Sequence, residues 1–207
     1  MLFAVCDPSL STESQIALSL RILCGFGIEE IADAFLTNKE TINKRLAKAR
    51  DKLRLAKVSI EYPGEEEINK RLETVVITLY LLFNEGYYSE SRDNVLRKDL
   101  CLEAMRLTYL LIENEPTNKP FVNALLSLMC FHASRFDARE NVHGEMILYQ
   151  DQDEFLWSQE LIKKGIYFFN LAAPQSNISK YHLEAGIAYC HTNKTDTKEK
   201  WENILQL

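Results

Sequence analysis

Apolar residues recur every three or four positions through most of the chain, the spacing that places them on one face of an α-helix. Near the N-terminus this pattern predicts helices over about 11–24, 28–35 and 39–55. Gly25-Phe26-Gly27 is expected to end the first helix, and Asn38 is a plausible cap for the third. The first 57 residues are therefore predicted to form a three-helix unit.

A second group of helices is predicted after Pro63-Gly64, which we take as the boundary between two domains. Apolar stripes indicate helices over about 65–85, 92–115, 120–134, 153–172, 179–192 and from 197 onward. The segment 179–189 has aromatic and small residues spaced as in one tetratricopeptide helix, without a second clear copy. The expected fold is all-α, with domains at 1–57 and 65–207 joined by a linker at 58–64. A small β-hairpin is expected near 141–149, around His143-Gly144.

Composition supports a helical, soluble protein. Glycine and proline are scarce, at 7 and 5 residues, whereas 46% of the residues are hydrophobic, enough to build a core. No apolar run reaches the length of a membrane span, and no basic segment follows Met1 as in a signal peptide. The five cysteines are odd in number and widely spaced, as reduced thiols in a cytosolic protein would be. We therefore expect a cytoplasmic protein with no membrane partner.

The charge is unevenly distributed along the chain. Between Lys39 and Lys57 there are eight basic and two acidic residues, a net charge of +6, whereas the whole chain carries -6. The remainder therefore carries -12. One basic helix within an acidic protein indicates a local site for a polyanion.

The segment around this basic helix has the spacing of a helix-turn-helix. Ala32 falls where two helices would cross, and four apolar residues would lock their angle: Ile31, Phe35, Ile42 and Leu46. On a helical projection, the side opposite the apolar stripe carries Thr41, Lys44, Arg45, Lys48 and Lys52. Such an arc suits the phosphates that line a DNA groove, although an ordinary solvated face explains it equally well.

The sequence over 28–54 resembles the last DNA-binding region of sigma factors of the extracytoplasmic-function type. The family pattern E-I-A, followed by T-[VI]-x-x-R-L-x-x-A-R, is matched by Glu30-Ile31-Ala32, Thr41-Ile42, Arg45-Leu46 and Ala49-Arg50. This resemblance implies binding to the -35 promoter element, with Thr41, Lys44, Arg45 and Lys48 facing it. One departure is Leu36, where many helix-turn-helix turns carry glycine.

The resemblance extends to a subgroup of these sigma factors that has a long helical extension related to tetratricopeptide repeats. The stretches that carry it are 3–10, 16–21, 79–87, 124–129 and 145–157. It implies promoter DNA and the RNA polymerase core as partners, with a possible regulatory protein on the helical domain. The family's earlier domain, which binds the polymerase clamp and opens the -10 element, has no counterpart here, so we expect the chain to start at the linker before the last domain.

Other candidate sites have simpler structural explanations. Asn84-Glu85-Gly86-Tyr87-Tyr88 could form a polar contact surface, but a helix end with Gly86 as a left-handed cap is the simpler interpretation. Asp151-Gln152-Asp153-Glu154 is more typical of helix capping than of a metal site or an acid–base pair. His132, Arg135 and Arg139 could form a polar pocket near the hairpin, although internal salt bridges explain them equally well. The four histidines lack ligand spacing, and no P-loop, dinucleotide motif or nucleophile elbow is present. We therefore expect no catalytic residue, metal or cofactor.

Three hypotheses for function follow. The leading one is a transcription initiation factor that binds the -35 element through the helix-turn-helix, with the helical domain as an interaction or regulatory module. The second is a helical protein-interaction scaffold with vestigial DNA binding, and the third is an enzyme or small-molecule sensor built in the helical domain. The split between +6 and -12, across a linker of only a few residues, further suggests that the acidic domain masks the basic helix, although two domains that merely sit side by side are an equal alternative.

Overall fold

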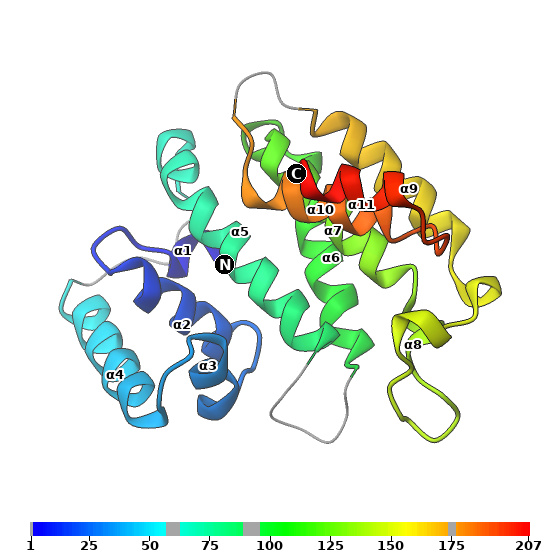
Figure 1. Ribbon diagram of the computed structural model, residues 1–207. Helices are drawn as coiled ribbons and strands as arrows, with labels where there is room; N and C mark the ends of the chain where they lie inside the picture. Colours follow the sequence, from blue (N-terminus) through cyan, green and yellow to red (C-terminus); the bar gives the residue numbers. More distant parts are fainter. Residues whose placement is uncertain (1, 57–62, 89–95, 174–176) are drawn as a thin grey trace.

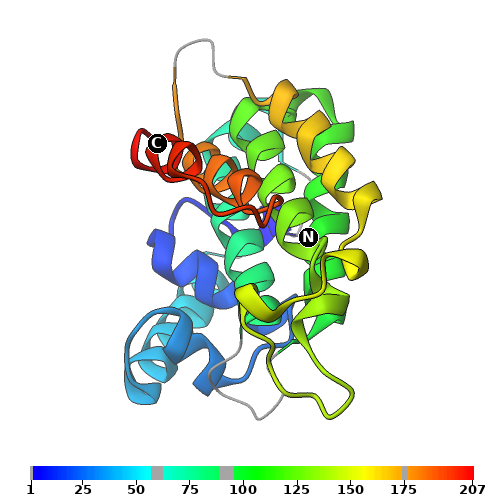
Figure 2. The ribbon, with the colours of Figure 1, turned by 45° about the vertical axis from the view of Figure 1, so that its right-hand side comes forward.

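The computed structural model describes residues 2–56, 63–88, 96–173 and 177–207, and helices make up the regular secondary structure of these segments (Figures 1 and 2). The predicted all-α fold is confirmed. The elements are α1 (Leu2–Val5), α2 (Thr12–Ile22), α3 (Ile28–Ala34), α4 (Lys39–Leu55), α5 (Glu65–Tyr87), α6 (Lys98–Glu113), η1 (Glu115–Thr117), α7 (Pro120–Ala133), α8 (Phe136–Arg139), η2 (Tyr149–Asp151), η3 (Glu154–Leu156), α9 (Gln159–Leu171), α10 (Lys180–Cys190) and α11 (Lys198–Leu205).

The N-terminal helices pack around α2. Every residue of α2 from Gln15 to Leu20 is buried, because α4 covers one side of the helix and α5 covers another. The predicted stop after α2 is confirmed: the chain turns at Gly25-Phe26-Gly27, and the Arg21 guanidinium donates to the carbonyl of Phe26 at 2.6 Å. This arrangement leaves α4 at the edge of the region.

The second region is built around α7, the most deeply buried helix. Its residues from Val122 to Phe131 are buried without interruption, since α5, α6, α9 and α10 all pack against it. Gly165 of α9 permits the closest approach, because a Cβ there would lie 2.4 Å from the ring of Phe131. The hydroxyl of Ser127 donates to the Gly165 carbonyl at 2.8 Å across the same contact.

Gly86 has a different role from the one predicted. It lies inside α5, which continues to Tyr87, and its φ is not in the left-handed region. A Cβ at Gly86 would lie 2.8 Å from Cys101 Sγ and 2.9 Å from the Arg97 carbonyl. The interpretation as a left-handed cap is therefore wrong: this glycine allows the start of α6 to approach the end of α5.

Two predicted elements of the region after α7 also differ from the structure. The expected hairpin near 141–149 is reduced to one antiparallel bridge between Glu140 and Met146, and no strand is found in the described residues. The helix expected from 153 begins only at Gln159, because Ser158 caps it by accepting from the Leu161 amide at 3.3 Å. The intervening chain forms the short turns η2 and η3, and Trp157 is buried beside Ala138 and Ile162.

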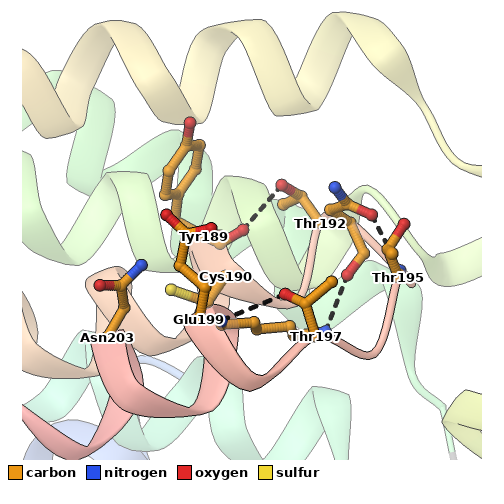
Figure 3. Close-up of a pocket in the computed structure, with 9 residues that line it drawn as sticks. Tyr189, Cys190, Thr192, Thr195, Thr197, Glu199 and Asn203 are labelled. Atoms are coloured by element: carbon orange, nitrogen blue, oxygen red, sulfur yellow. Dashed lines mark hydrogen bonds between the residues drawn. The ribbon is translucent and has the colours of Figure 1, made fainter.

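The C-terminal helices enclose a small polar pocket of about 310 Å³ at the turn between α10 and α11 (Figure 3). The turn is held by its own hydrogen bonds, among them Thr192 Oγ1 to the Tyr189 carbonyl at 2.7 Å and Lys200 Nζ to the Asn193 carbonyl at 2.8 Å. Because these polar groups already bond to one another, this pocket is explained as part of the turn.

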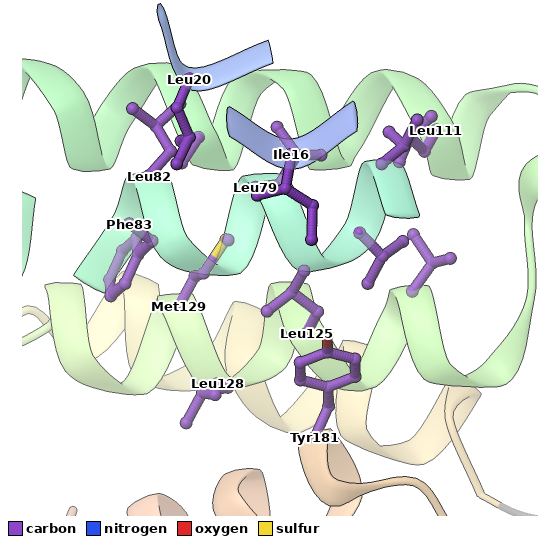
Figure 4. Close-up of a cluster of buried hydrophobic side chains, with 14 of the residues drawn as sticks. Ile16, Leu20, Leu79, Leu82, Phe83, Leu111, Leu125, Leu128, Met129 and Tyr181 are labelled. Atoms are coloured by element: carbon purple, nitrogen blue, oxygen red, sulfur yellow. The ribbon is translucent and has the colours of Figure 1, made fainter. Parts of the chain in front are cut away.

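One hydrophobic core runs through both regions. Figure 4 shows Ile16 and Leu20 of α2 beside Leu79 and Leu82 of α5, with Leu125 and Met129 of α7 on the other side of α5. The same core includes residues on both sides of the expected linker at 58–64, of which 58–62 lie outside the described residues. The division into domains at 1–57 and 65–207 therefore remains a prediction about folding units, since α5 packs against helices of both regions.

Candidate nucleic-acid interface

Helices α3 and α4 form the compact pair that the sequence predicts. Ala32 lies at their contact and is buried, and so are three of the four apolar residues expected to lock the angle: Ile31, Ile42 and Leu46. The fourth, Phe35, is half-buried at the end of α3. An exposed ion pair between Lys39 and Glu29, at 2.5 Å, joins the starts of the two helices.

The turn between α3 and α4 has the left-handed conformation that glycine usually supplies. Leu36 has a φ of 48° and a side chain that is 96% exposed, so it gains no packing for this backbone conformation. Left-handed backbone costs a residue with a Cβ about 1–2 kcal/mol. The next residues compensate: Thr37 donates its amide to the Ala32 carbonyl at 2.9 Å, and Asn38 caps α4 by accepting from the Thr41 amide at 2.8 Å. The predicted Asn38 cap is confirmed.

Helix α4 carries the residues that were predicted to contact DNA, and the structure places most of them on its exposed side. Lys44 and Lys48 are exposed, and Thr41 is half-buried at the first turn. Lys44 forms an ion pair with Glu40 at 2.6 Å, whereas Lys48 has no ion pair within the described part of the chain. Exposed pairs of this kind are worth about 0–1 kcal/mol, so a phosphate can displace Glu40 at little cost.

Arg45 differs from its neighbours, and the sequence analysis missed its second role. It is half-buried, with its guanidinium carbon 5.0 Å from the centre of the Phe35 ring. Its Nη1 atom is buried without a hydrogen-bond partner. On the helical projection Arg45 lies at the end of the cationic arc next to the buried stripe, which explains this position. Arg45 packs over Phe35 within the helix-turn-helix, so replacing it would alter the packing of the two helices as well as the charge of α4.

Lys52 is also partly engaged within the protein. Its ammonium donates to the Ser9 carbonyl, which ties the last turns of α4 to the loop before α2. Arg54 forms an ion pair with Asp51 at 2.9 Å, and Arg50 is exposed with no ion pair in the described segments. The accessible cations of the predicted face are therefore Lys44 and Lys48, near the middle of α4, and Arg50 is a further exposed cation outside that predicted set.

In the described part of the chain, no element of the helical region packs extensively against α4. Helix α4 packs on α2 and α3, whereas α5 packs on α1, α2 and α3 (Figures 1 and 2). Besides the packing of α5, the two regions are joined by the Glu30–Arg97 ion pair, at 3.3 Å, with the Glu30 carboxylate buried and Arg97 three-quarters buried. No extensive contact between α4 and the helical region is found among the described residues, and masking of the basic helix stays a prediction.

The histidine and arginine pocket expected near the hairpin is present but packs around an aromatic ring. Arg139 lies over the ring of Tyr87 at 3.9 Å, and Arg135 Nη2 lies 3.3 Å from both the Tyr87 hydroxyl and His132 Nδ1. Burial and the two nearby guanidinium groups lower the pKa of His132 to about 3. Because this imidazole is neutral and in contact with the core, we interpret the cluster around His132 as part of the packing of the helices.

The remaining candidates are structural. Asp153 accepts from the Phe155 amide at 3.0 Å and so caps η3, in agreement with the capping interpretation. His182 accepts from the Ser179 amide at 3.0 Å at the start of α10. The five cysteines form no disulfide, and burial raises the pKa of Cys6 and Cys24 to about 11 and of Cys101 and Cys130 to about 12. Within the described residues, no group of side chains is suited to hold a metal ion, and no helix is long and apolar enough to cross a membrane.

Comparisons with known proteins give a family match over part of the helical region and a relative that is similar over almost the whole chain. Residues 71–173 match a family of unknown function, DUF6596, and this match lies outside α2, α3 and α4. The chain is 33% identical over 205 residues to an uncharacterized protein of Rhizobium meliloti (strain 1021), a comparison that covers 99% of this chain and 48% of the relative. The chain thus spans about half the length of the curated relative that it matches. No solved structure matches it. The segment from α5 to α9 is therefore similar to a family of unknown function, and the helix-turn-helix precedes that segment.

Proposed function

We propose that the protein binds double-stranded DNA through α4 and acts in transcription initiation, at the -35 promoter element, as the resemblance to extracytoplasmic-function sigma factors implies. The observation that carries the proposal is the pairing of an accessible cationic face with a helix-turn-helix that presents it. Lys44 lies in the first half of α4 and Lys48 just past its middle, on the exposed side that a recognition helix turns toward the major groove. RNA polymerase core is the partner that this role requires.

The contacts divide into two kinds. Lys44 and Lys48 would neutralise phosphates, and the side chain of Thr41, near the helix start, would lie closest to base edges. Arg45 would add to the positive electrostatic potential of α4, and its packing over Phe35 would stabilise the turn. If these three cations neutralise two or three phosphates, the plot of log affinity against log salt concentration should have a slope of about -2 to -3.

The test is the affinity of the full chain for a labelled duplex that contains a -35-like element, measured by fluorescence anisotropy across a salt titration. We expect Lys44→Glu combined with Lys48→Glu to weaken binding at low salt by at least about tenfold. These two residues are preferable to Arg45, because they make no packing contact with Phe35.

A matched control exists in the helical region. Lys198 matches Lys44, because each forms an ion pair with a glutamate four residues away on its own helix. Lys163 matches Lys48, because both are exposed and have no ion pair in the described chain. Lys163→Glu combined with Lys198→Glu makes the same charge change elsewhere and should preserve binding. Equal losses in the two double variants would reject α4 as the DNA face. A duplex with a scrambled -35 element separates promoter recognition from general affinity for DNA.

A further inference from the structure

The helical region has an open groove that its own helices do not fill. Helices α6 and α9 both pack on α7, but they make little contact with each other. Between them lies a cavity of about 700 Å³, with α6 and α9 as walls and α7 as floor. This volume lies within the range of about 300–1,000 Å³ typical of ligand sites, and sites between the helices of a bundle are common.

The walls of the groove are apolar and exposed. Leu102, Tyr109 and Tyr167 expose 55%, 47% and 59% of their surfaces. Met105 and Phe168 continue the walls, and Leu126 and Cys130 form the floor. Scattered exposed apolar residues are ordinary, but a contiguous set on two facing helices marks an interaction site. Tyrosine is also the kind of residue on which binding energy concentrates.

The register of the walls indicates the shape of the occupant. Leu102, Met105 and Tyr109 are spaced i, i+3 and i+7 along α6, so they form one straight ridge about 10 Å long, or two helical turns. On α9, Leu161 and Phe168 are separated by the same two turns. A helix laid between the ridges would present its own anchors at this spacing, as in helix-in-groove recognition.

The rim indicates the charge of the occupant. The lining contains three cationic side chains, Arg106, Lys163 and Lys164, and one carboxylate, Glu160. Glu160 is paired with Lys164 at 2.8 Å, and Arg106 is held by Glu103 outside the lining at 2.7 Å. Lys163 is exposed and has no ion pair in the described segments. A locally positive rim in a chain of net charge -6 favours an acidic partner.

We propose that the groove between α6 and α9 binds an amphipathic helix of another protein, one with an apolar face flanked by acidic residues. Apolar anchors enter the groove beside Tyr109 and Tyr167, and the acidic flank lies against Lys163. A second copy of this chain is a poorer occupant through α4, because that helix is itself cationic.

The test uses the full chain and three labelled 16-residue peptides. The first has leucines on one helical face and glutamates beside them, the second has lysines in place of the glutamates, and the third scrambles the leucines off one face. Anisotropy titrations at low salt should show the acidic amphipathic peptide binding at least about tenfold more tightly than either control.

Variants then locate the site. Tyr109→Ala combined with Tyr167→Ala should weaken the acidic peptide by at least about tenfold, because the exposed anchors of both walls are lost. Lys163→Glu should reduce the preference for the acidic over the lysine peptide by several-fold, and its exposed position protects the fold. Phe155→Ala removes an aromatic side chain that is 98% exposed elsewhere and is the matched control, with no expected change.

Several results would overturn the proposal. They are no binding of the acidic peptide, equal binding of the scrambled peptide, or binding that the tyrosine double variant leaves unchanged. Self-association of the wild-type chain that disappears in the tyrosine double variant, measured by sedimentation, would assign the groove to a second copy instead. DNA affinity should be unchanged in all three variants, so this proposal and the proposed DNA binding stand or fall separately.

Discussion

Helices α4 and α7 show how differently the two regions of this molecule use a helix. Helix α4 buries one stripe, Ile42, Leu46 and Ala49, and leaves its cationic surface in solvent. Helix α7 is buried on almost every side, and its neighbours α5, α6, α9 and α10 come from before and after it in the chain. The N-terminal region therefore presents a surface, whereas the region around α7 supplies a scaffold. They are joined at α5, which packs against α2 on one side and α7 on the other.

The strongest test of this comparison is whether the two regions unfold together. Leu79→Ala removes a buried side chain of α5 at the junction between α2 and α7 (Figure 4). We expect the free energy of unfolding to fall by about 3 kcal/mol, in a single transition, because the cavity lies in the common core.

Two spectroscopic signals distinguish the unfolding of the helical region from that of the whole chain. Both tryptophans, Trp157 and Trp201, lie in the helical region, so their fluorescence reports on it alone, whereas far-ultraviolet circular dichroism reports on the whole chain. Coincident urea transitions would support one folding unit. Two separate transitions would support the division at 58–64 that the sequence predicts.

A smaller effect of pH should act on the helical region, because all four histidines lie there. The pKa of His132 is lowered to about 3 by burial and by Arg135 and Arg139. The unfolded chain therefore takes up a proton near pH 6.5 that the folded protein refuses, so stability falls as pH decreases from about 6.5 toward 3. His191, whose pKa burial also lowers, adds to this fall.

Between pH 6.5 and 5 we expect His132 to account for a loss of about 1–2 kcal/mol in the free energy of unfolding. His132→Gln should flatten this part of the profile, and His143→Gln, an exposed residue of the 140–146 turn, serves as the control. A profile that His132→Gln leaves as steep as that of the wild type would show that the imidazole titrates normally in the folded protein.

The smallest effect concerns the helix-turn-helix alone. Leu36→Gly should stabilise the protein by about 1 kcal/mol or less, because relief of the left-handed backbone exceeds the added entropy of glycine in the unfolded chain. Leu36→Ala keeps the Cβ and should be nearly neutral, because the leucine side chain is exposed. Thermal unfolding of the two variants measures the difference, and equal midpoints would mean that the turn is not strained.

The sequence by itself determined the elements whose causes are local. The bounds of α4, the Asn38 cap and the buried stripe of Ile42 and Leu46 agree with the prediction, because a helical period and a capping side chain are readable within a few residues. The cationic face of α4 is likewise a property of spacing. Its DNA binding remains a prediction, since charge alone does not distinguish a binding face from a solvated one.

Only the tertiary structure decided the features that depend on distant neighbours. Gly86 looked like a helix cap but serves the approach of α6, and Arg45 belongs to the packing of Phe35 as well as to the cationic face. The groove between α6 and α9 also has no local signature, because it exists only where two helices flank a third with little contact between them. A pattern along the chain records which face of a helix is apolar, but the partner of that face is set by the packing of the whole chain.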